Sequence, residues 1–250
     1  MRKVAIFVEG QTELIFVREF LLKIFEYQNI NIGCFNLFTN NNYHSTDYAF
    51  PSEINETYPF YFEIINVGND NAVLSRILRR EKYLWNSGFD KIIGLRDMYS
   101  RVYREEAQNA QISETLNQLF KQTHQEQIDK QAERPNDIHF IFAIMEVEAW
   151  FLGFQEVFMS LDARLTIDFI QQNLDFDLSS IDLETTFFHP TKNINEIYSL
   201  VNETYTKRRS EVEAFMSFLS KDDFELLKME NKCQSYSEFY NTIPKNEDLN

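Results

Sequence analysis

The sequence predicts an α/β protein with a mostly parallel sheet flanked by helices and a C-terminal helical appendage. Short apolar runs, which are typical of buried strands, alternate with segments whose apolar residues recur at helical spacing. Strands that alternate with helices form βαβ units, and the strands of such units run parallel. Beyond residue 160, helical patterns and short acidic segments remain, without clear strands.

The first strand and the first helix are the clearest elements. Residues 4–8 form an apolar run, and Gly10 allows a tight turn after it. From Leu14 to Phe25, apolar residues recur at helical spacing. We therefore expect a buried strand that leads into an amphipathic helix, with Glu9 at the carboxyl end of the strand.

The remaining elements of the N-terminal part follow in order. Further strands are expected at residues 31–38, 59–67, 92–95 and 138–144, and helices at 69–85, 105–134 and 145–153. Residues 39–58 are rich in Asn, Ser, Thr and Pro, which predicts a long polar loop. The helix at 69–85 carries a basic cluster, which either contacts phosphate or forms a solvated face. Its members are Arg76, Arg79, Arg80 and Lys82.

The C-terminal part begins near residue 160. We expect a turn around Pro190, helices at residues 193–202, 210–219 and 235–240, and a polar tail. The predicted domains are therefore an α/β domain over residues 1–159 and a helical appendage over residues 160–250, packed on that domain.

The composition limits the classes of partner. The 250 residues include 24 basic and 39 acidic ones, for a formal net charge of −15. Binding to phosphates needs local Lys and Arg, so the chain does not bind polyanions non-specifically. Action on nucleic acid would require a local basic patch, a metal ion or a basic partner. An acidic surface could also dock on a basic protein.

Cysteine and histidine offer few sites. Cys34 and Cys233 have no paired spacing, which argues against a disulfide scaffold or a cysteine zinc site. We expect His139 in the core and His124 on a solvated helix face. The sequence shows no signal peptide and no apolar run of about 18 residues, so we expect a cytoplasmic protein without a membrane partner. A homodimer is left open.

Acidic residues follow several of the expected strands. Glu9 ends the first strand, Asp97 comes just after the strand at 92–95, and Glu146 and Glu148 follow the strand at 138–144. Right-handed crossovers place the carboxyl ends of parallel strands on one edge, where ligands bind in open α/β sheets. Mg²⁺ or Mn²⁺ prefers such oxygen ligands. Because residues two apart on a regular helix face different ways, we expect Glu146 to be the better ligand.

The opening string, residues 3–13, resembles the first motif of a TOPRIM domain, the metal-dependent fold of topoisomerases, primases and OLD-like nucleases. The resemblance implies that the motif's glutamate is Glu9. In TOPRIM domains the second motif is Asp-x-Asp at a strand end. Here it reads Asp97-Met98-Tyr99, so a tyrosine replaces the second acid, which puts the number of bound metal ions in doubt.

The string at residues 146–151 is similar to a little-characterised bacterial branch of TOPRIM-like proteins. Its members follow the acidic string with a Pro-x-Lys and a Tyr-x-Lys, which match Pro190-Thr191-Lys192 and Tyr205-Thr206-Lys207. Lys192 and Lys207 would suit phosphate-charge stabilisation. Arg208 and Arg209 fit a basic helix end slightly better. The resemblance also implies pairing with an ABC-type ATPase in bacterial anti-phage systems.

Two functional hypotheses remain. The first is a Mg²⁺-dependent nuclease that cleaves phosphodiester bonds in DNA or RNA, with Glu9, Asp97, Glu146 and Glu148 as metal ligands. The second is an acidic subunit with a degenerate site that docks on a partner ATPase. Phosphoryl transfer on a small nucleotide is less favoured, because no Gly-rich phosphate loop is present.

Overall fold

The computed structural model describes residues 1–37, 42–69, 72–107, 110–179 and 182–245. The chain divides into two compact units. The first comprises Met1–Ser100 and Glu114–Phe142, and the second comprises Arg101–Ser113 and the chain from Ala143 onward. The expected domain boundary after residue 159 falls within helix α6, Gln155–Leu161.

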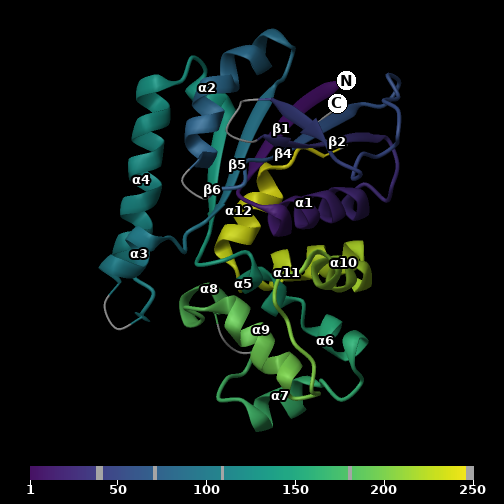
Figure 1. Ribbon diagram of the computed structural model, residues 1–250, viewed down its shortest axis with the longest axis vertical. Helices are drawn as coiled ribbons and strands as arrows, with labels where there is room; N and C mark the ends of the chain where they lie inside the picture. Colours follow the sequence, from purple (N-terminus) through teal and green to yellow (C-terminus); the bar gives the residue numbers. More distant parts are fainter. Residues whose placement is uncertain (38–41, 70–71, 108–109, 180–181, 246–250) are drawn as a thin grey trace. The chain divides into compact units, whose positions relative to one another are not determined.

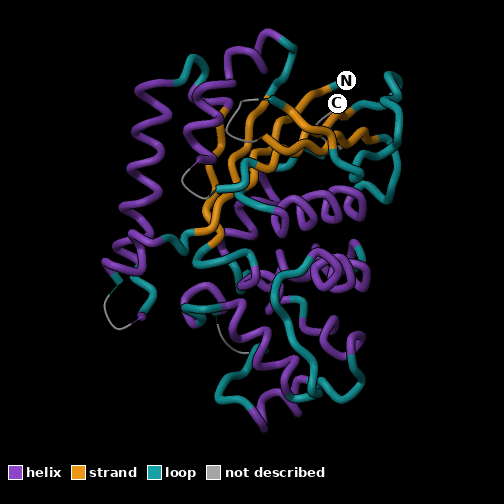
Figure 2. Tube along the Cα trace, in the orientation of Figure 1, coloured by secondary structure: helices purple, strands orange, loops and turns teal. Residues whose placement is uncertain are grey.

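The first unit is built on a mostly parallel sheet, as the sequence predicts (Figures 1 and 2). In its described part the strand order is β3-β2-β4-β1-β5-β6. β1 pairs in parallel with β4 and β5, and β2 pairs in parallel with β4. The strands are β1 (Arg2–Val8), β2 (Ile30–Leu37), β3 (Tyr43–Ser45), β4 (Phe60–Asn66), β5 (Lys91–Asp97) and β6 (Ile138–Ala143).

β1 occupies the centre of the sheet because its apolar run can be buried on both faces. Residues 4–8 are all buried, as expected for a parallel strand that is covered by helices on two sides. Val8 lies beside Asn66 of β4 and Leu95 of β5. The residue that follows Val8 therefore emerges between the carboxyl ends of two neighbouring strands.

Helices cover both faces of the sheet (Figure 1). Helix α1 (Gln11–Ile24) contacts β1, β2 and β4 on one face. Helices α2 (Val73–Asn86) and α4 (Glu114–Gln131) belong to the core of the other face. That core includes alternate residues of β1, namely Ala5 and Phe7, which follows from the two-residue period of a strand.

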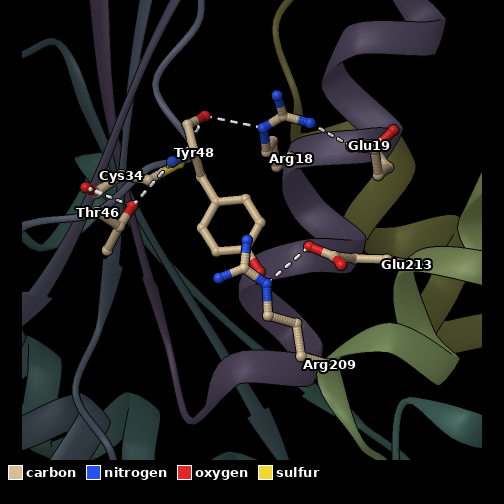
Figure 3. A network of polar contacts seen from close by, with 7 residues as sticks. All are labelled: Arg18, Glu19, Cys34, Thr46, Tyr48, Arg209 and Glu213. Atoms are coloured by element: carbon tan, nitrogen blue, oxygen red, sulfur yellow. Dashed lines mark hydrogen bonds and ion pairs between the residues drawn. The ribbon is translucent and has the colours of Figure 1, made fainter.

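The expected polar loop at residues 39–58 is more ordered than its composition predicts, although residues 38–41 lie outside the described residues. β3 pairs antiparallel with β2, and Phe50 forms a bridge with Ile32. The Arg18 side chain donates to the carbonyl of Tyr48 at 2.8 Å, and Thr46 donates to the carbonyl of Cys34 at 3.0 Å (Figure 3). Backbone pairing and side-chain donors thus tie the segment to β2 and α1.

The basic cluster of α2 is not a simple solvated face. Arg76 is buried, and the guanidinium of Arg80 lies 4.1 Å from the ring centroid of Tyr43. The guanidinium of Arg80 therefore makes a cation–π contact within the first unit. Arg79 and Lys82 remain exposed on the helix.

The predicted helix at residues 105–134 is two helices. Helix α3 (Arg101–Glu106) belongs to the second unit, and α4 to the first. The Tyr103 hydroxyl accepts a hydrogen bond from the backbone N–H of Ser113 at 3.0 Å, which fixes the connection after α3. Polar periodicity continued through the break, so it did not reveal the interruption.

The second unit is helical in its described part. Its core contains the fully buried rings of Trp150, Phe151, Phe158, Phe215 and Tyr236. Besides α3 and α6, its helices are α5 (Glu148–Gly153), α7 (Ile167–Asn173), α8 (Leu183–Thr186), α9 (Pro190–Ser199), α10 (Arg209–Phe218), α11 (Lys221–Glu230) and α12 (Gln234–Thr242).

Two features of this unit differ from the prediction. Pro190 does not centre a turn but opens α9, because proline fixes the φ angle and needs no N–H partner in the first helical turn. Helices α6, α7, α8 and α11 were not predicted. Ser220 caps α11 by accepting from the N–H of Asp223. No helix among the described residues is both long and apolar enough to cross a membrane.

Candidate functional site

Glu9 and Asp97 meet at the carboxyl edge of the first unit's sheet. Glu9 follows the last residue of β1, and Asp97 is the last residue of β5. The N–H of Asp97 donates to Oε2 of Glu9 at 3.2 Å. The backbone pairing of β1 and β5 ends at Val8 and Leu95. The hydrogen bond from the N–H of Asp97 to the Glu9 side chain lies just beyond that point. The two predicted acids are therefore brought together by the register of the sheet.

Arg96, next to Asp97, contacts helix α4, which covers one face of the sheet. It is buried, and its Nη1 lies 3.2 Å from Nε2 of His124. Nδ1 of His124 lies 2.9 Å from the carbonyl of Phe120, which can only accept. Nδ1 therefore carries the proton, and Nε2 accepts from Arg96. Burial lowers the pKa of His124, which keeps the ring neutral.

The expectation that His124 lies on a solvated helix face was therefore wrong. Its ring packs against Phe140 and Phe142, with centroid distances of 5.0 and 4.8 Å. The polar residues around His124 in the sequence lie on other faces of α4, so they hid this apolar contact. Through its Nε2, His124 accepts from Arg96 and so holds the Arg96 side chain in place.

Glu146 and Glu148 belong to the second unit. β6 ends at Ala143, so Glu146 lies in the turn before α5, and Glu148 is the first residue of that helix. Met145, just before Glu146, has a φ of 64°. Such left-handed backbone is uncommon outside glycine, and it is often found at functional sites.

One ammonium group bridges the two glutamates. Nζ of Lys207 lies 3.0 Å from Oε1 of Glu146 and 2.8 Å from Oε2 of Glu148. The rule that residues two apart face different ways applies within a regular helix. Glu146 precedes α5, so the rule does not separate it from Glu148, and one group can reach both carboxylates.

Neutral donors hold the other oxygens of these two carboxylates. Thr191 donates to Oε2 of Glu146 from its N–H at 3.1 Å and from its hydroxyl at 2.9 Å. The hydroxyl of Tyr205 donates to Oε1 of Glu148 at 3.3 Å. Burial first, and then the charge of Glu148, raises the pKa of Tyr205 well above its usual range. Tyr205 therefore stays a neutral donor.

The basic residues of the sequence motifs separate into two groups. Lys207 contacts both glutamates, and its own backbone has a φ of 59°. Lys192 is exposed and lies 3.6 Å from Glu196, one helical turn away. Arg209 donates to Glu213 at 2.9 Å on α10 (Figure 3). It is the first residue of that helix, where a positive charge opposes the helix dipole, so the expectation of a favourable basic helix end was wrong. Of these residues, Lys207 is the one that the structure joins to the acids.

Thr191 and Tyr205 were not predicted as site residues. Both stand within the two short motifs, one position before Lys192 and two before Lys207. Their motif positions were the available signal, but the lysines drew the functional interpretation because they carry charge. The geometry gives the anchoring roles to the hydroxyl and backbone donors instead.

A second buried carboxylate, Glu184, organises the start of α5. Its Oε1 accepts from Nε1 of Trp150 at 2.9 Å and from the hydroxyl of Ser235, and its Oε2 accepts from the N–H of Ser235 at 2.9 Å. The Ser235 hydroxyl also accepts from the N–H of Ile144 at 3.4 Å. Burial raises the pKa of Glu184. Nothing in the acidic segment around this residue distinguished it in the sequence.

Carboxylates that could hold a metal ion stand in both units: Asp97 in the first, and Glu146 and Glu148 in the second. All three offer oxygen atoms, which are the ligands that Mg²⁺ and Mn²⁺ prefer. In each unit, the available ligands are therefore of the kind that a hard divalent cation takes. The two cysteines are buried, and burial raises the pKa of both thiols, so neither suits a thiolate metal site.

Comparison with protein-family models, with curated proteins and with solved structures found no match for the chain.

Proposed function

We propose that this protein is a divalent-cation-dependent nuclease of the TOPRIM type. The observation that carries the proposal is the hydrogen bond between Glu9 and the N–H of Asp97 at the carboxyl ends of two adjacent parallel strands. Ligands of open α/β sheets bind at that edge. The opening string around Glu9 and its resemblance to the TOPRIM motif support the same function.

The proposed metal ligands are Glu9, Asp97, Glu146 and Glu148. Glu9 follows β1, Asp97 ends β5, and Glu146 follows the end of β6 by three residues. A bound Mg²⁺ or Mn²⁺ would activate water and stabilise negative charge on a phosphodiester. Because Tyr99 stands where a second acid would follow β5, Asp97 is the one acid that this strand end contributes.

The chain's own residues would prepare the site for that chemistry. The N–H of Asp97 orients the Glu9 carboxylate, and Thr191 and Tyr205 orient Glu146 and Glu148. Lys207 supplies positive charge that a phosphate could meet. Because the net charge is −15, the cation and this local basic group would have to offset repulsion between the protein and a nucleic acid.

The substrate is DNA or RNA in this proposal. A role as the effector of an anti-phage system with an ABC-type ATPase partner rests on resemblance alone. The nucleic-acid substrate and the anti-phage role both extend the proposed metal-dependent activity, and each needs its own experiment.

The test is cleavage of labelled single-stranded and double-stranded DNA and of RNA, in Mg²⁺ or Mn²⁺, with and without a co-expressed ATPase partner. We expect Glu9→Gln and Asp97→Asn to reduce the rate by about 10²-fold or more. Glu53→Gln, which neutralises an exposed acid of the same unit, is the matched control. Equal cleavage by the parent and both site variants would refute the proposal.

A second candidate function is an acidic subunit that docks on a basic partner such as an ATPase. The pairing of Lys207 with both glutamates favours it, because an internal cation already offsets one of their two negative charges. Under this alternative, calorimetry would detect no Mn²⁺ binding to the parent, and complex formation with the partner would weaken as salt increases. Mn²⁺ binding that Asp97→Asn abolishes would favour the nuclease.

A further inference from the structure

The ammonium group of Lys207 sits where the two glutamates of the second unit offer their oxygens. Its Nζ is 3.0 Å from Oε1 of Glu146 and 2.8 Å from Oε2 of Glu148. The side chain of Glu148 is fully buried and that of Glu146 is 14% exposed. Two acids this deeply buried need a counter-ion, because an uncompensated buried charge is strongly destabilising.

A divalent cation bound to the same two oxygens would compete with this ammonium. Carboxylate oxygens approach such a cation to about 2.0–2.6 Å. A cation between the two oxygens would therefore lie close to the present position of the ammonium. Two positive groups at that separation repel strongly in a partly buried site. Lys207 and a metal ion cannot both hold these oxygens.

The lysine is the partner that can move. Thr191 fixes the other oxygen of Glu146, and Tyr205 fixes the other oxygen of Glu148. The backbone beside Lys207 is also anchored, since the N–H of Thr206 donates to Glu211 at 2.7 Å. The side chain of Lys207 is 28% exposed and has a flexible four-carbon stem, which gives its ammonium a path to water.

We propose that Lys207 is a built-in counter-ion that a divalent cation displaces from Glu146 and Glu148. The inference rests on the proposed metal-dependent function and assigns the lysine a place in metal loading. Without metal, the ammonium offsets part of the negative charge of the two buried acids and so stabilises the unit. With metal, the ammonium would leave the two oxygens for solvent, where it could meet a substrate phosphate.

The first test uses the unaltered protein. Lysine residues are labelled by reductive methylation with and without Mn²⁺, and the extent at each lysine is measured by mass spectrometry. We expect Mn²⁺ to raise labelling of Lys207 by about fivefold or more, because an ammonium released from its ion pairs into solvent is more accessible to the reagent. Lys192, which pairs with Glu196 on the exposed face of α9, is the internal control and should be unchanged.

The second test is calorimetry of Mn²⁺ binding to variants. Lys207→Gln should bind Mn²⁺ about tenfold more tightly than the parent, since the competing charge is gone. The same variant should melt at a lower temperature without metal and recover with Mn²⁺. Lys192→Gln should match the parent in both measurements. Lys207→Arg keeps the positive charge and should not gain affinity.

The outcomes separate this inference from the proposed function. Mn²⁺ binding that depends on Glu146, together with unchanged labelling of Lys207 and unchanged affinity in Lys207→Gln, would overturn the displacement and leave the metal site standing. An absence of Mn²⁺ binding in the parent and in Lys207→Gln would overturn both. Weaker binding in Lys207→Gln would make the lysine a supporting group instead of a competitor.

Discussion

Oε2 of Glu9 accepts a hydrogen bond from the backbone N–H of Asp97 at 3.2 Å, just beyond the last paired residues of β1 and β5. A side-chain hydrogen bond therefore links the two strands beyond the end of their backbone pairing. The positions of both acids are set by the register of two buried strands, not by a loop. This is the kind of rigid placement that a metal site or a catalytic site requires.

The Glu9 contact allows its structural and chemical roles to be separated. Glu9→Ala removes the acceptor from the N–H of Asp97, and we expect a loss of about 1–2 kcal/mol in the free energy of unfolding. Glu9→Gln keeps an acceptor oxygen, so the loss should be about 0.5 kcal/mol. Urea unfolding measures both values.

Both Glu9 variants should weaken Mn²⁺ binding, since each removes the charge of the carboxylate. Glu53→Gln provides the control for a neutralised exposed acid. Undiminished Mn²⁺ affinity in Glu9→Gln would mean that Glu9 only closes the ladder and does not bind metal.

Tyr205→Phe tests the support of the buried Glu148. The change removes the hydroxyl that donates to Oε1 of Glu148 and leaves the aromatic packing in place. We expect a loss of about 1.5 kcal/mol in the free energy of unfolding, because a buried charged acceptor loses a donor. Tyr198→Phe is the matched control, since its ring centroid lies 5.6 Å from that of Tyr205. Equal losses in the two variants would argue against a specific role for the Tyr205 hydroxyl.

Glu184 should make the stability of the protein depend on pH. Burial raises its pKa in the folded state above the ordinary value of 4.5, although donors from Ser235 and Trp150 partly oppose the shift. The folded state thus binds the proton more tightly than the unfolded chain does. Its contribution to stability is present below the unfolded pKa and is lost as pH rises through the folded pKa.

The comparison that isolates this effect is Glu184→Gln, whose side chain is neutral at every pH. Between the ordinary carboxyl pKa and neutral pH, the free energy of unfolding of the parent should fall relative to that of Glu184→Gln. Urea unfolding at a series of pH values gives the two curves. Glu203→Gln, at an exposed acid of the same unit, should give a curve parallel to the parent. A Glu184→Gln curve that is also parallel would contradict the prediction.

Gly94 of β5 is required by close packing of the first unit. A Cβ atom there would lie 2.7 Å from Cδ2 of Phe140 and 2.8 Å from Cδ1 of Ile77. Gly94→Ala should therefore cost about 1–3 kcal/mol through overpacking. Ile77→Val removes one of the clashing atoms, so the double variant should lose less stability than the sum of the single variants.

Gly68→Ala supplies the contrast to Gly94→Ala. Gly68 has a φ of 68° and nothing within 4 Å of an added Cβ, so its cost of about 1–2 kcal/mol comes from the backbone alone. Combination with Ile77→Val should be additive at this position. A coupling as large as that of Gly94 would show that the double-variant effect is not local.

The order of strands and helices in the first unit could be predicted because it depends on local patterns. The apolar run of β1, the turn at Gly10 and the periodicity of α1 specify their conformations within a few residues. The same patterns put Glu9 and Asp97 at strand ends, and parallel pairing then brought them to one edge. The break between α3 and α4 escaped prediction because both sides share a polar helical pattern.

The partners of the acidic residues depend on contacts between distant parts of the chain. Glu146 and Glu148 are separated from Lys207 by 61 and 59 positions, and Glu184 from Ser235 by 51. Sequence spacing carries no information on such pairs, because the packing of α5, α8 and the segment before α10 sets them. The sequence by itself determined the α/β pattern and the strand-end position of Glu9 and Asp97. Only the tertiary structure decided which charges are neutralised and which side chains hold them, since burial of a charge requires a partner that folding alone brings into reach.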